Sequence, residues 1–343
     1  MTQEGTRLSD EIVKFNVGEE APYRMILHPS GGTIVISLAL GGLKVVNVGY
    51  TAGEAPKMSW PVEPVKTAAA NCSKLGVIKC MSFSSDGSLL AIGTEDGRAF
   101  ILAWPSLSIL ESVEACPGRA IRNIDFSSAH NDGILFVVDD NGKCSLWSTD
   151  KLEYMSDMTG PKDKARFSIF RCLSTTDAQG IVVYGAATCK GEGYALRWRQ
   201  TNEGELVLDS TNKSPTIRSP ISGMELSHDG KFMAAVTPDG EQSLISTESL
   251  KCVKLVKRAH MTFATAVAFS PDDTAIISVS ADASATLCMV PKVTNGSMAV
   301  ILAIFFAILA VAIHMLRSYG KTNPEKVIEA VELIPWLKVF FNM

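Results

Sequence analysis

The sequence predicts an all-β protein: a β-propeller of repeated four-stranded units, followed by one C-terminal transmembrane helix. Three observations lead to this prediction. A short motif, in which an apolar residue precedes Ser or His and then a turn, occurs six times. A brief apolar run rich in β-branched residues follows each motif, which is typical of strands buried on both faces. An uncharged apolar stretch at residues 297–316 is long enough to cross a bilayer.

The six motifs are spaced like the blades of a propeller. They are Leu27-His-Pro-Ser-Gly31, Phe83-Ser-Ser-Asp-Gly87, Phe126-Ser127, Leu173-Ser174, Leu226-Ser-His-Asp-Gly230 and Phe269-Ser-Pro-Asp-Asp273. Their first residues lie 56, 43, 47, 53 and 43 residues apart. This spacing fits blades of about 40–45 residues, with loop insertions in the longer intervals.

Each repeat continues with further strand and turn signals. The apolar runs are 34–36, 89–92, 134–138, 181–184, 232–236 and 275–277, and the second turns include 41–42, 95–97, 140–142 and 238–240. The Gly, Asn and Asp residues of these turns suit the tight hairpins between strands. A third strand then ends on Trp104, Trp147 or Trp198, close to the WD position of WD repeats. The repeats therefore predict a WD-repeat propeller.

The number of blades stays open between two alternatives. Residues 21–291 hold six visible repeats, and residues 1–20 form an N-terminal segment that contains one candidate strand, Ile12–Val17. Either this strand closes a ring of six blades, or a seventh blade is incomplete. The interval Gly49–Gly76 is longer than a hairpin and has room for an outer strand and an excursion.

The apolar stretch from Ser297 to Leu316 is the predicted membrane anchor. At 1.5 Å per residue such a helix spans a hydrocarbon core of about 30 Å. Positive charges are more frequent after the span than before it, which favours a cytosolic tail, but no apolar signal segment opens the sequence. We give the missing signal more weight and expect a cytosolic propeller and a lumenal tail, 317–343. This tail either lies on the membrane interface or is an unstructured extension.

Composition excludes several functions. The net charge of −4 gives no basis for nucleic-acid binding, and the eight scattered cysteines show no metal-ligand spacing and read as reduced core residues. The one basic cluster, Lys251, Lys254, Lys257 and Arg258, is interpreted first as a solvated outer strand, with a patch for a partner or for lipid headgroups as the alternative. No catalytic, cofactor or metal motif occurs, so we expect no catalytic, cofactor-binding or metal residues.

The histidines are interpreted as structural or surface residues rather than catalytic ones. His260 precedes the last repeat at a spacing that lets it meet Asp282, a pairing that WD blades use to hold their structure. His28 and His228 lie in predicted turns, where we expect exposed side chains.

The chain resembles the Sec-type exchange factors of the endoplasmic reticulum, and within them a plant branch, the phosphate transporter traffic facilitators. The resemblance rests on residues 21–30, on 95–106, and above all on Lys257-Arg-Ala-His-Met-Thr-Phe-Ala-Thr-Ala-Val-Ala-Phe-Ser-Pro-Asp272. It implies a single-pass protein of the endoplasmic reticulum membrane that lets cargo leave. The exchange factors load a Sar-type GTPase with GTP to start COPII vesicle budding, and a glycine-rich, potassium-binding loop acts on that GTPase. No such glycine run occurs here, so no catalytic residue carries over, and a further blade upstream of this chain is left open.

Three functions remain from the sequence. The first is a non-enzymatic facilitator of export from the endoplasmic reticulum, with phosphate transporters or other membrane proteins as cargo. The second is an active guanine nucleotide exchange factor for a Sar-type GTPase. The third is a membrane-tethered scaffold without further specificity.

Overall fold

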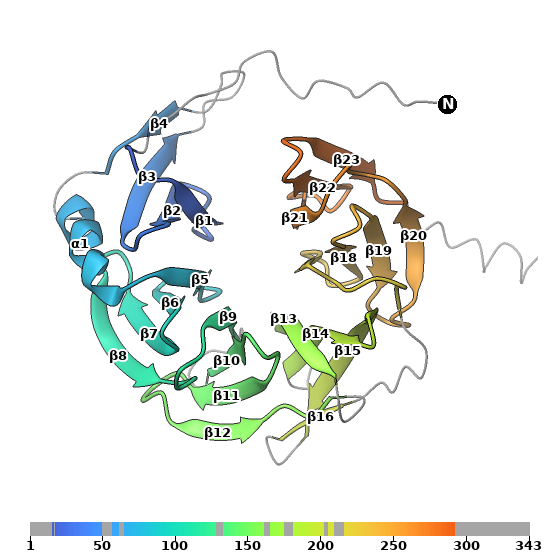
Figure 1. Cartoon of the computed structure of the whole chain (residues 1–343), viewed down its shortest axis with the longest axis horizontal. Helices are drawn as coiled ribbons and strands as arrows, with labels where there is room; N and C mark the ends of the chain where they lie inside the picture. The colour runs from blue at the N-terminus through green and yellow to red at the C-terminus, as the bar shows by residue number, and fades with distance from the viewer. Residues whose placement is uncertain are drawn as a thin grey trace, which may run out of the picture. The chain divides into compact units, whose positions relative to one another are not determined.

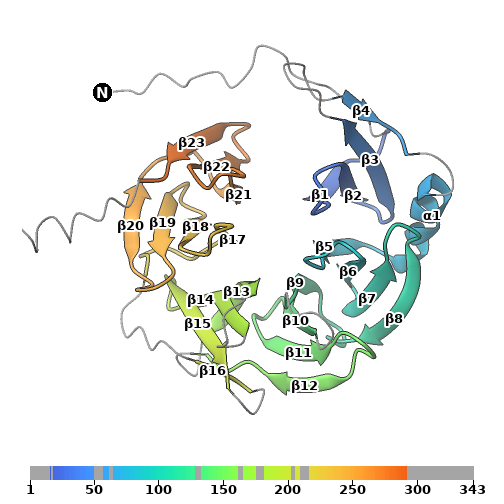
Figure 2. The same cartoon turned by 180° about the vertical axis from the view of Figure 1, so that it is seen from behind.

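The computed structural model describes residue 16 and residues 18–49, 57–61, 65–127, 133–160, 165–174, 181–201, 205–208 and 216–291. Six antiparallel sheets stand around a central axis, and the first strand of each lies on the inner wall (Figures 1 and 2). The predicted all-β propeller is confirmed, with six blades. We number the blades in chain order.

The first three blades have four strands each. Blade 1 comprises β1 (Pro22–Leu27), β2 (Thr33–Leu38), β3 (Leu43–Gly49) and β4 (Lys57–Ser59). Blade 2 comprises β5 (Ile78–Phe83), β6 (Leu89–Thr94), β7 (Arg98–Ala103) and β8 (Ser108–Glu114). Blade 3 comprises β9 (Ile121–Phe126), β10 (Ile134–Asp139), β11 (Cys144–Ser148) and β12 (Tyr154–Asp157).

Blades 4 and 5 repeat this order, and blade 6 has three described strands. Blade 4 comprises β13 (Arg166–Ser174), β14 (Ile181–Cys189), β15 (Glu192–Gln200) and β16 (Leu206–Leu208). Blade 5 comprises β17 (Gly223–Leu226), β18 (Phe232–Val236), β19 (Gln242–Ser246) and β20 (Cys252–Val256). Blade 6 comprises β21 (Ala264–Phe269), β22 (Ala275–Ser280) and β23 (Ala285–Met289). Each predicted apolar run lies within a second strand, which explains its burial between two neighbouring sheets.

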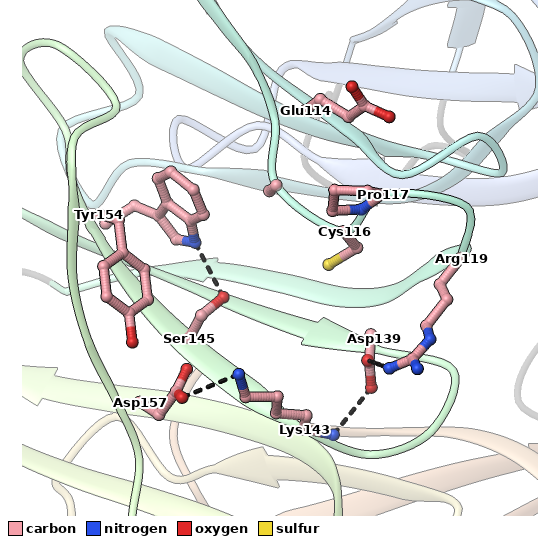
Figure 3. A pocket seen from close by; sticks show the side chains of 11 residues that line it. Glu114, Cys116, Pro117, Arg119, Asp139, Lys143, Ser145, Tyr154 and Asp157 are labelled. Carbon is pink, nitrogen blue, oxygen red and sulfur yellow. Dashed lines mark hydrogen bonds and ion pairs between the residues drawn. The ribbon is translucent and has the colours of Figure 1, made fainter.

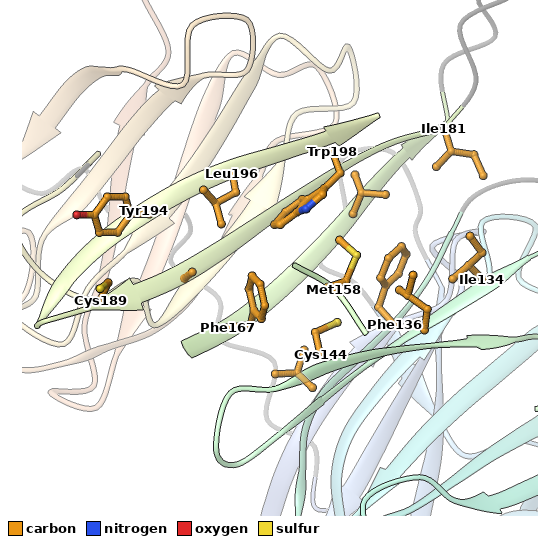
Figure 4. Packing of buried hydrophobic residues seen from close by; sticks show 14 residues of the cluster. Ile134, Phe136, Cys144, Met158, Phe167, Ile181, Cys189, Tyr194, Leu196 and Trp198 are labelled. Atoms are coloured by element: carbon orange, nitrogen blue, oxygen red, sulfur yellow. The ribbon is translucent and has the colours of Figure 1, made fainter. Parts of the chain in front are cut away.

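Apolar clusters between neighbouring blades form the core. One cluster brings together Phe136 of β10, Phe167 of β13 and Trp198 of β15, and both Phe136 and Trp198 are fully buried (Figure 4). The rings of Phe167 and Trp198 lie 5.9 Å apart, centroid to centroid. Removing one such ring from a core costs about 3–5 kcal/mol. The blades therefore depend on one another for stability.

Glycines in the second hairpins let the link to the next blade pass close to the hairpin backbone. Gly97 has a φ of +88°, and a Cβ placed there would lie 1.9 Å from the Cys116 carbonyl oxygen. Gly240 has a φ of +72°, and its Cβ would lie 2.5 Å from the His260 carbonyl oxygen. Both the left-handed backbone and the close approach favour glycine. The Asp-Gly turns at these two positions are thus the places where the links between blades pack against the hairpins.

The described strands leave a gap between blades 1 and 6 in both views (Figures 1 and 2). Among the described residues, no strand pairs with the outer edge of β23. Apolar side chains on both sides of the opening are exposed, including Met25 at 67% and Met289 at 58%. The candidate closing strand Ile12–Val17 lies almost entirely outside the described residues, so its role stays a prediction.

The long interval after β3 holds the predicted outer strand, β4, and an excursion that is helical. This excursion comprises α1 (Val65–Asn71) and the 3₁₀ turn η1 (Cys72–Leu75), with Cys72 and Leu75 buried. In the part of the chain that the structure describes, no helix is long and apolar enough to cross a membrane. The predicted span 297–316 and the tail 317–343 lie outside that part.

Candidate functional site

His260 and Asp282 lie close together in blade 6, joined through a serine. The buried His260 ring has its Nδ1 2.8 Å from the Ser284 hydroxyl oxygen and its Nε2 2.7 Å from that of Ser278. Its Nδ1 is 4.0 Å from the nearer Asp282 oxygen. Asp282 accepts hydrogen bonds from the backbone N–H groups of Met261 and Ser284. The Ser284 side chain is the largest cause that holds the pKa of Asp282 well below its usual range, and the two backbone N–H groups add to it.

The three tryptophans stand in different surroundings. Trp198 is fully buried and donates to the Thr159 carbonyl at 3.3 Å. Trp147 is buried and donates to the Ser145 hydroxyl at 2.8 Å. Trp104 follows β7 and stacks on the His28 ring, with centroids 5.4 Å apart. The expectation that His28 is exposed is therefore wrong, because Trp104 partly covers it, whereas His228 is exposed as expected.

A chain of polar side chains joins the inner strands of blades 2 to 5. Ser82 of β5 donates to Asp125 of β9 at 2.5 Å. Arg171 of β13 then pairs with Asp125 at 3.5 Å and with Glu225 of β17 at 3.1 Å. Asp125 is largely shielded from solvent, with 13% of its side chain exposed. The guanidinium therefore holds two carboxylates from neighbouring blades and fixes how those blades meet along the inner wall.

One face of the ring carries the second hairpins and the links between blades, and we call it the linker face. Strands alternate in direction within each blade, so α1, the β10–β11 hairpin and the link Ala115–Ala120 all lie on this face. A backbone hydrogen bond joins this link to the β6–β7 hairpin: the Cys116 N–H donates to the Gly97 carbonyl at 2.9 Å.

A charged pocket of about 350 Å³ opens between blades 2 and 3 on the linker face (Figure 3). Arg119 pairs with Asp139 at 3.1 Å, and Lys143 pairs with Asp157 at 2.8 Å. The rings of Trp147 and Tyr154 meet edge to face on one side, 5.6 Å apart. Because both cations are paired and the pairs are partly exposed, the pocket is suited to polar contact with a partner rather than to chemistry.

Cysteine chemistry is suppressed at this pocket and elsewhere. Burial raises the pKa of the Cys116 thiol to about 11, with Asp139 and Asp140 adding to the shift. Burial likewise raises the pKa of Cys72 to about 11 and that of Cys80 to about 12. A thiol that keeps its proton is a poor nucleophile. All seven cysteines with described side chains are free, and within the described ranges no group of His, Cys, Asp or Glu could hold a metal ion.

An apolar cleft lies between β3 and α1, also on the linker face. The cleft has a volume of about 150 Å³ and is lined by the start of β3, which includes Lys44, and by Trp60, Pro61 and Lys66. The Lys44 ammonium lies 6.0 Å from the Trp60 ring centre. Trp60 is 41% exposed, and Leu40 at the tip of the β2–β3 hairpin is 81% exposed. An exposed tryptophan beside an apolar cleft is typical of protein-binding surfaces.

Sequence reasoning missed these two linker-face features. The length of the interval Gly49–Gly76 pointed to an excursion, but neither the helix nor the exposure of Trp60 followed from it. The pairing of Arg171 with two carboxylates gave no sequence signal, because its partners are 46 and 54 residues away. The predicted anchor ends, Ser297 and Leu316, lie outside the described residues.

Comparison with known proteins gives the following matches. The WD domain, G-beta repeat, matches residues 63–101 and 250–287. The chain is 27% identical over 278 residues to SEC12-like protein 2 of Arabidopsis thaliana, covering 80% of this chain and 66% of the relative. It is 26% identical over 262 residues to the guanine nucleotide-exchange factor SEC12 of Rattus norvegicus, covering 70% and 61%. These matches span less than two thirds of the relatives' own length.

A solved structure shares the fold. The structure of U3-55K aligns with a TM-score of 0.59 and 14% identity, covering 81% of this chain and 80% of that one. At this identity the likeness shows the propeller fold alone. Together, these comparisons show that the chain contains WD repeats and is similar to SEC12-like proteins.

Proposed function

We propose that this chain is a membrane protein of the endoplasmic reticulum that binds a Sar-type small GTPase and promotes the export of membrane cargo. The extent of its likeness to SEC12-like relatives carries the proposal. That likeness covers 80% of the chain, whereas the matched WD segments cover only residues 63–101 and 250–287. The similarity in sequence therefore extends over most of the propeller and not only over the two segments that match the repeat.

The membrane part of the proposal rests on the sequence. One span at 297–316 anchors the protein, the propeller faces the cytosol, and the tail 317–343 lies in the lumen. In this arrangement the propeller meets a cytosolic GTPase beside the membrane where cargo collects. The resemblance to the plant branch makes phosphate transporters the cargo class of the proposal.

The linker face around Trp60 is the proposed contact for the GTPase. It combines an apolar cleft, two exposed apolar side chains and two lysines, Lys44 and Lys66. Central aromatic residues of this kind commonly contribute about 2 kcal/mol or more to protein binding. No other function gains comparable support from the described surface.

We further propose that this contact docks the GTPase without strongly accelerating nucleotide release. Exchange requires an element that enters the nucleotide site and displaces what holds the nucleotide. The second hairpins of the described blades are short, the longest running from Thr237 to Glu241. The excursion that holds α1 contains no glycine run.

Guanine nucleotide exchange is the second candidate function, and one observation favours it: the rat relative is named as an exchange factor. Under this alternative, the excursion with α1 and Trp60 is the described element that extends farthest beyond a tight hairpin and is therefore the one to test.

The experiment reconstitutes the full chain in liposomes and titrates it with a Sar-type GTPase carrying a fluorescent guanine nucleotide. We expect saturable binding that Trp60→Ala weakens by tenfold or more, about 1.4 kcal/mol. Ile109→Ala, which removes an exposed apolar side chain from β8, is the matched control and should bind normally. Absence of saturable binding by the wild-type chain would overturn the proposal.

A further inference from the structure

Among the described outermost strands, β20 and its ends carry the largest number of cations. Strand β20 and its ends carry Lys251, Lys254, Lys257 and Arg258, all exposed. The outermost strands of blades 2 and 3 are acidic instead: β8 carries Glu111 and Glu114 and no cation, and β12 ends on Asp157. We call residues 251–258 the cationic rim.

Apolar side chains alternate with the cations along this strand. Val253 and Leu255 flank Lys254, and they are 50% and 39% exposed. The strand itself contains no acidic residue, although Glu241 lies close enough to contribute to the raised pKa of Cys252, which burial mainly causes. Cations interspersed with exposed aliphatic residues match a membrane surface, where headgroups take the charge and the acyl boundary takes the apolar groups.

The cationic rim lies beside the point where the described chain ends. The Lys254 ammonium donates to the Met289 carbonyl at 2.9 Å, and Met289 is the last residue of β23. Ser297, the first residue of the predicted span, follows eight residues later. Eight extended residues reach at most roughly 29 Å. An anchor at 297–316 therefore keeps the cationic rim at high local concentration near the bilayer.

We propose that the cationic rim binds acidic phospholipid headgroups of the membrane in which the chain is anchored. The inference rests on the proposed anchor and cytosolic orientation, and it adds a second, electrostatic contact that sets the orientation of the ring. Contact through blade 5 turns the acidic rim of blades 2 and 3 away from the lipid. The headgroup attraction amounts to roughly fivefold in local binding per cation.

The test uses the full chain in proteoliposomes of phosphatidylcholine with and without phosphatidylserine. Lysines are acetylated briefly and their reactivity is read by mass spectrometry. We expect phosphatidylserine to protect Lys251, Lys254 and Lys257 severalfold, and high salt to remove the protection. Lys151, which precedes the acidic strand β12, is the internal control and should not change.

Variants separate this contact from the anchor. In the wild-type chain, phosphatidylserine should slow hydrogen exchange in peptides that contain Arg258. A triple variant with Lys251→Glu, Lys254→Glu and Lys257→Glu should lose this effect, whereas Lys151→Glu should keep it. Flotation with neutral liposomes reports the anchor alone. A chain that floats but shows equal lysine reactivity in both liposomes overturns the cationic rim as a lipid contact. A chain that does not float overturns the proposed anchor, and this inference with it.

Discussion

Replacing Gly97 by alanine tests how the blades are linked. At this residue two costs combine: a φ of +88° and a carbonyl oxygen, that of Cys116, 1.9 Å from the new Cβ. The left-handed conformation costs an L-residue about 1–2 kcal/mol, offset by about 0.4–1 kcal/mol from a less flexible unfolded chain. The clash must also displace the link, which disturbs the hydrogen bond from the Cys116 N–H to the Gly97 carbonyl. We expect a total loss of about 3–4 kcal/mol.

Gly191→Ala is the matched control for this prediction. Gly191 lies in the corresponding hairpin of blade 4 with a φ of +82°, but nothing lies within 4 Å of the position that its new methyl group would take. Its loss should stay near about 1 kcal/mol, since only the backbone cost remains. Urea unfolding of the full chain in detergent, followed by tryptophan fluorescence, compares the two midpoints. Equal midpoints for Gly97→Ala and Gly191→Ala would refute the claim that the link at Cys116 leaves no room for a side chain at position 97.

Three further predictions address the network, the turns and the anchor. Arg171→Met should lower the free energy of unfolding by about 2–4 kcal/mol, because Asp125 stays shielded without its cation, whereas the exposed Arg122→Met should change it by less than about 0.5 kcal/mol in the same urea titration. Asp86 has its pKa lowered from 3.8 to about 2, chiefly by the Ser84 hydroxyl. Its stabilisation is therefore present above about pH 4 and lost as the pH falls towards 2. Asp86→Asn should flatten that part of the pH profile of stability, by at most about 1 kcal/mol at this exposed site. Truncation before Ser297 should release the chain from membranes, and a truncated chain that resists carbonate extraction would contradict the predicted anchor.

Much of the fold could be predicted because its signals are local. The runs at 134–138 and 232–236 are apolar and short, and turn residues bound them on both sides, so β10 and β18 follow from the sequence. The Asp-Gly turns follow for the same reason. Helix α1 did not follow, because seven residues with three alanines carry no apolar periodicity.

The candidate site depends on contacts between distant segments, which a single sequence does not report. The reason for glycine at position 97 lies in the path of the link 19 residues later, at Cys116. The stacking of Trp104 on His28 joins blades 1 and 2, which made a turn histidine half-buried instead of exposed.

Binding of a Sar-type GTPase to the full chain in liposomes tests the proposed function most directly. Equilibrium binding and nucleotide release are measured in the same titration, with the wild-type chain and with Trp60→Ala. The account predicts saturable binding, weakened by Trp60→Ala, and a nearly unchanged release rate. Strong acceleration of nucleotide release would show that the chain acts as an exchange factor and does not only dock the GTPase. A wild-type chain that shows no saturable binding would contradict the central claim.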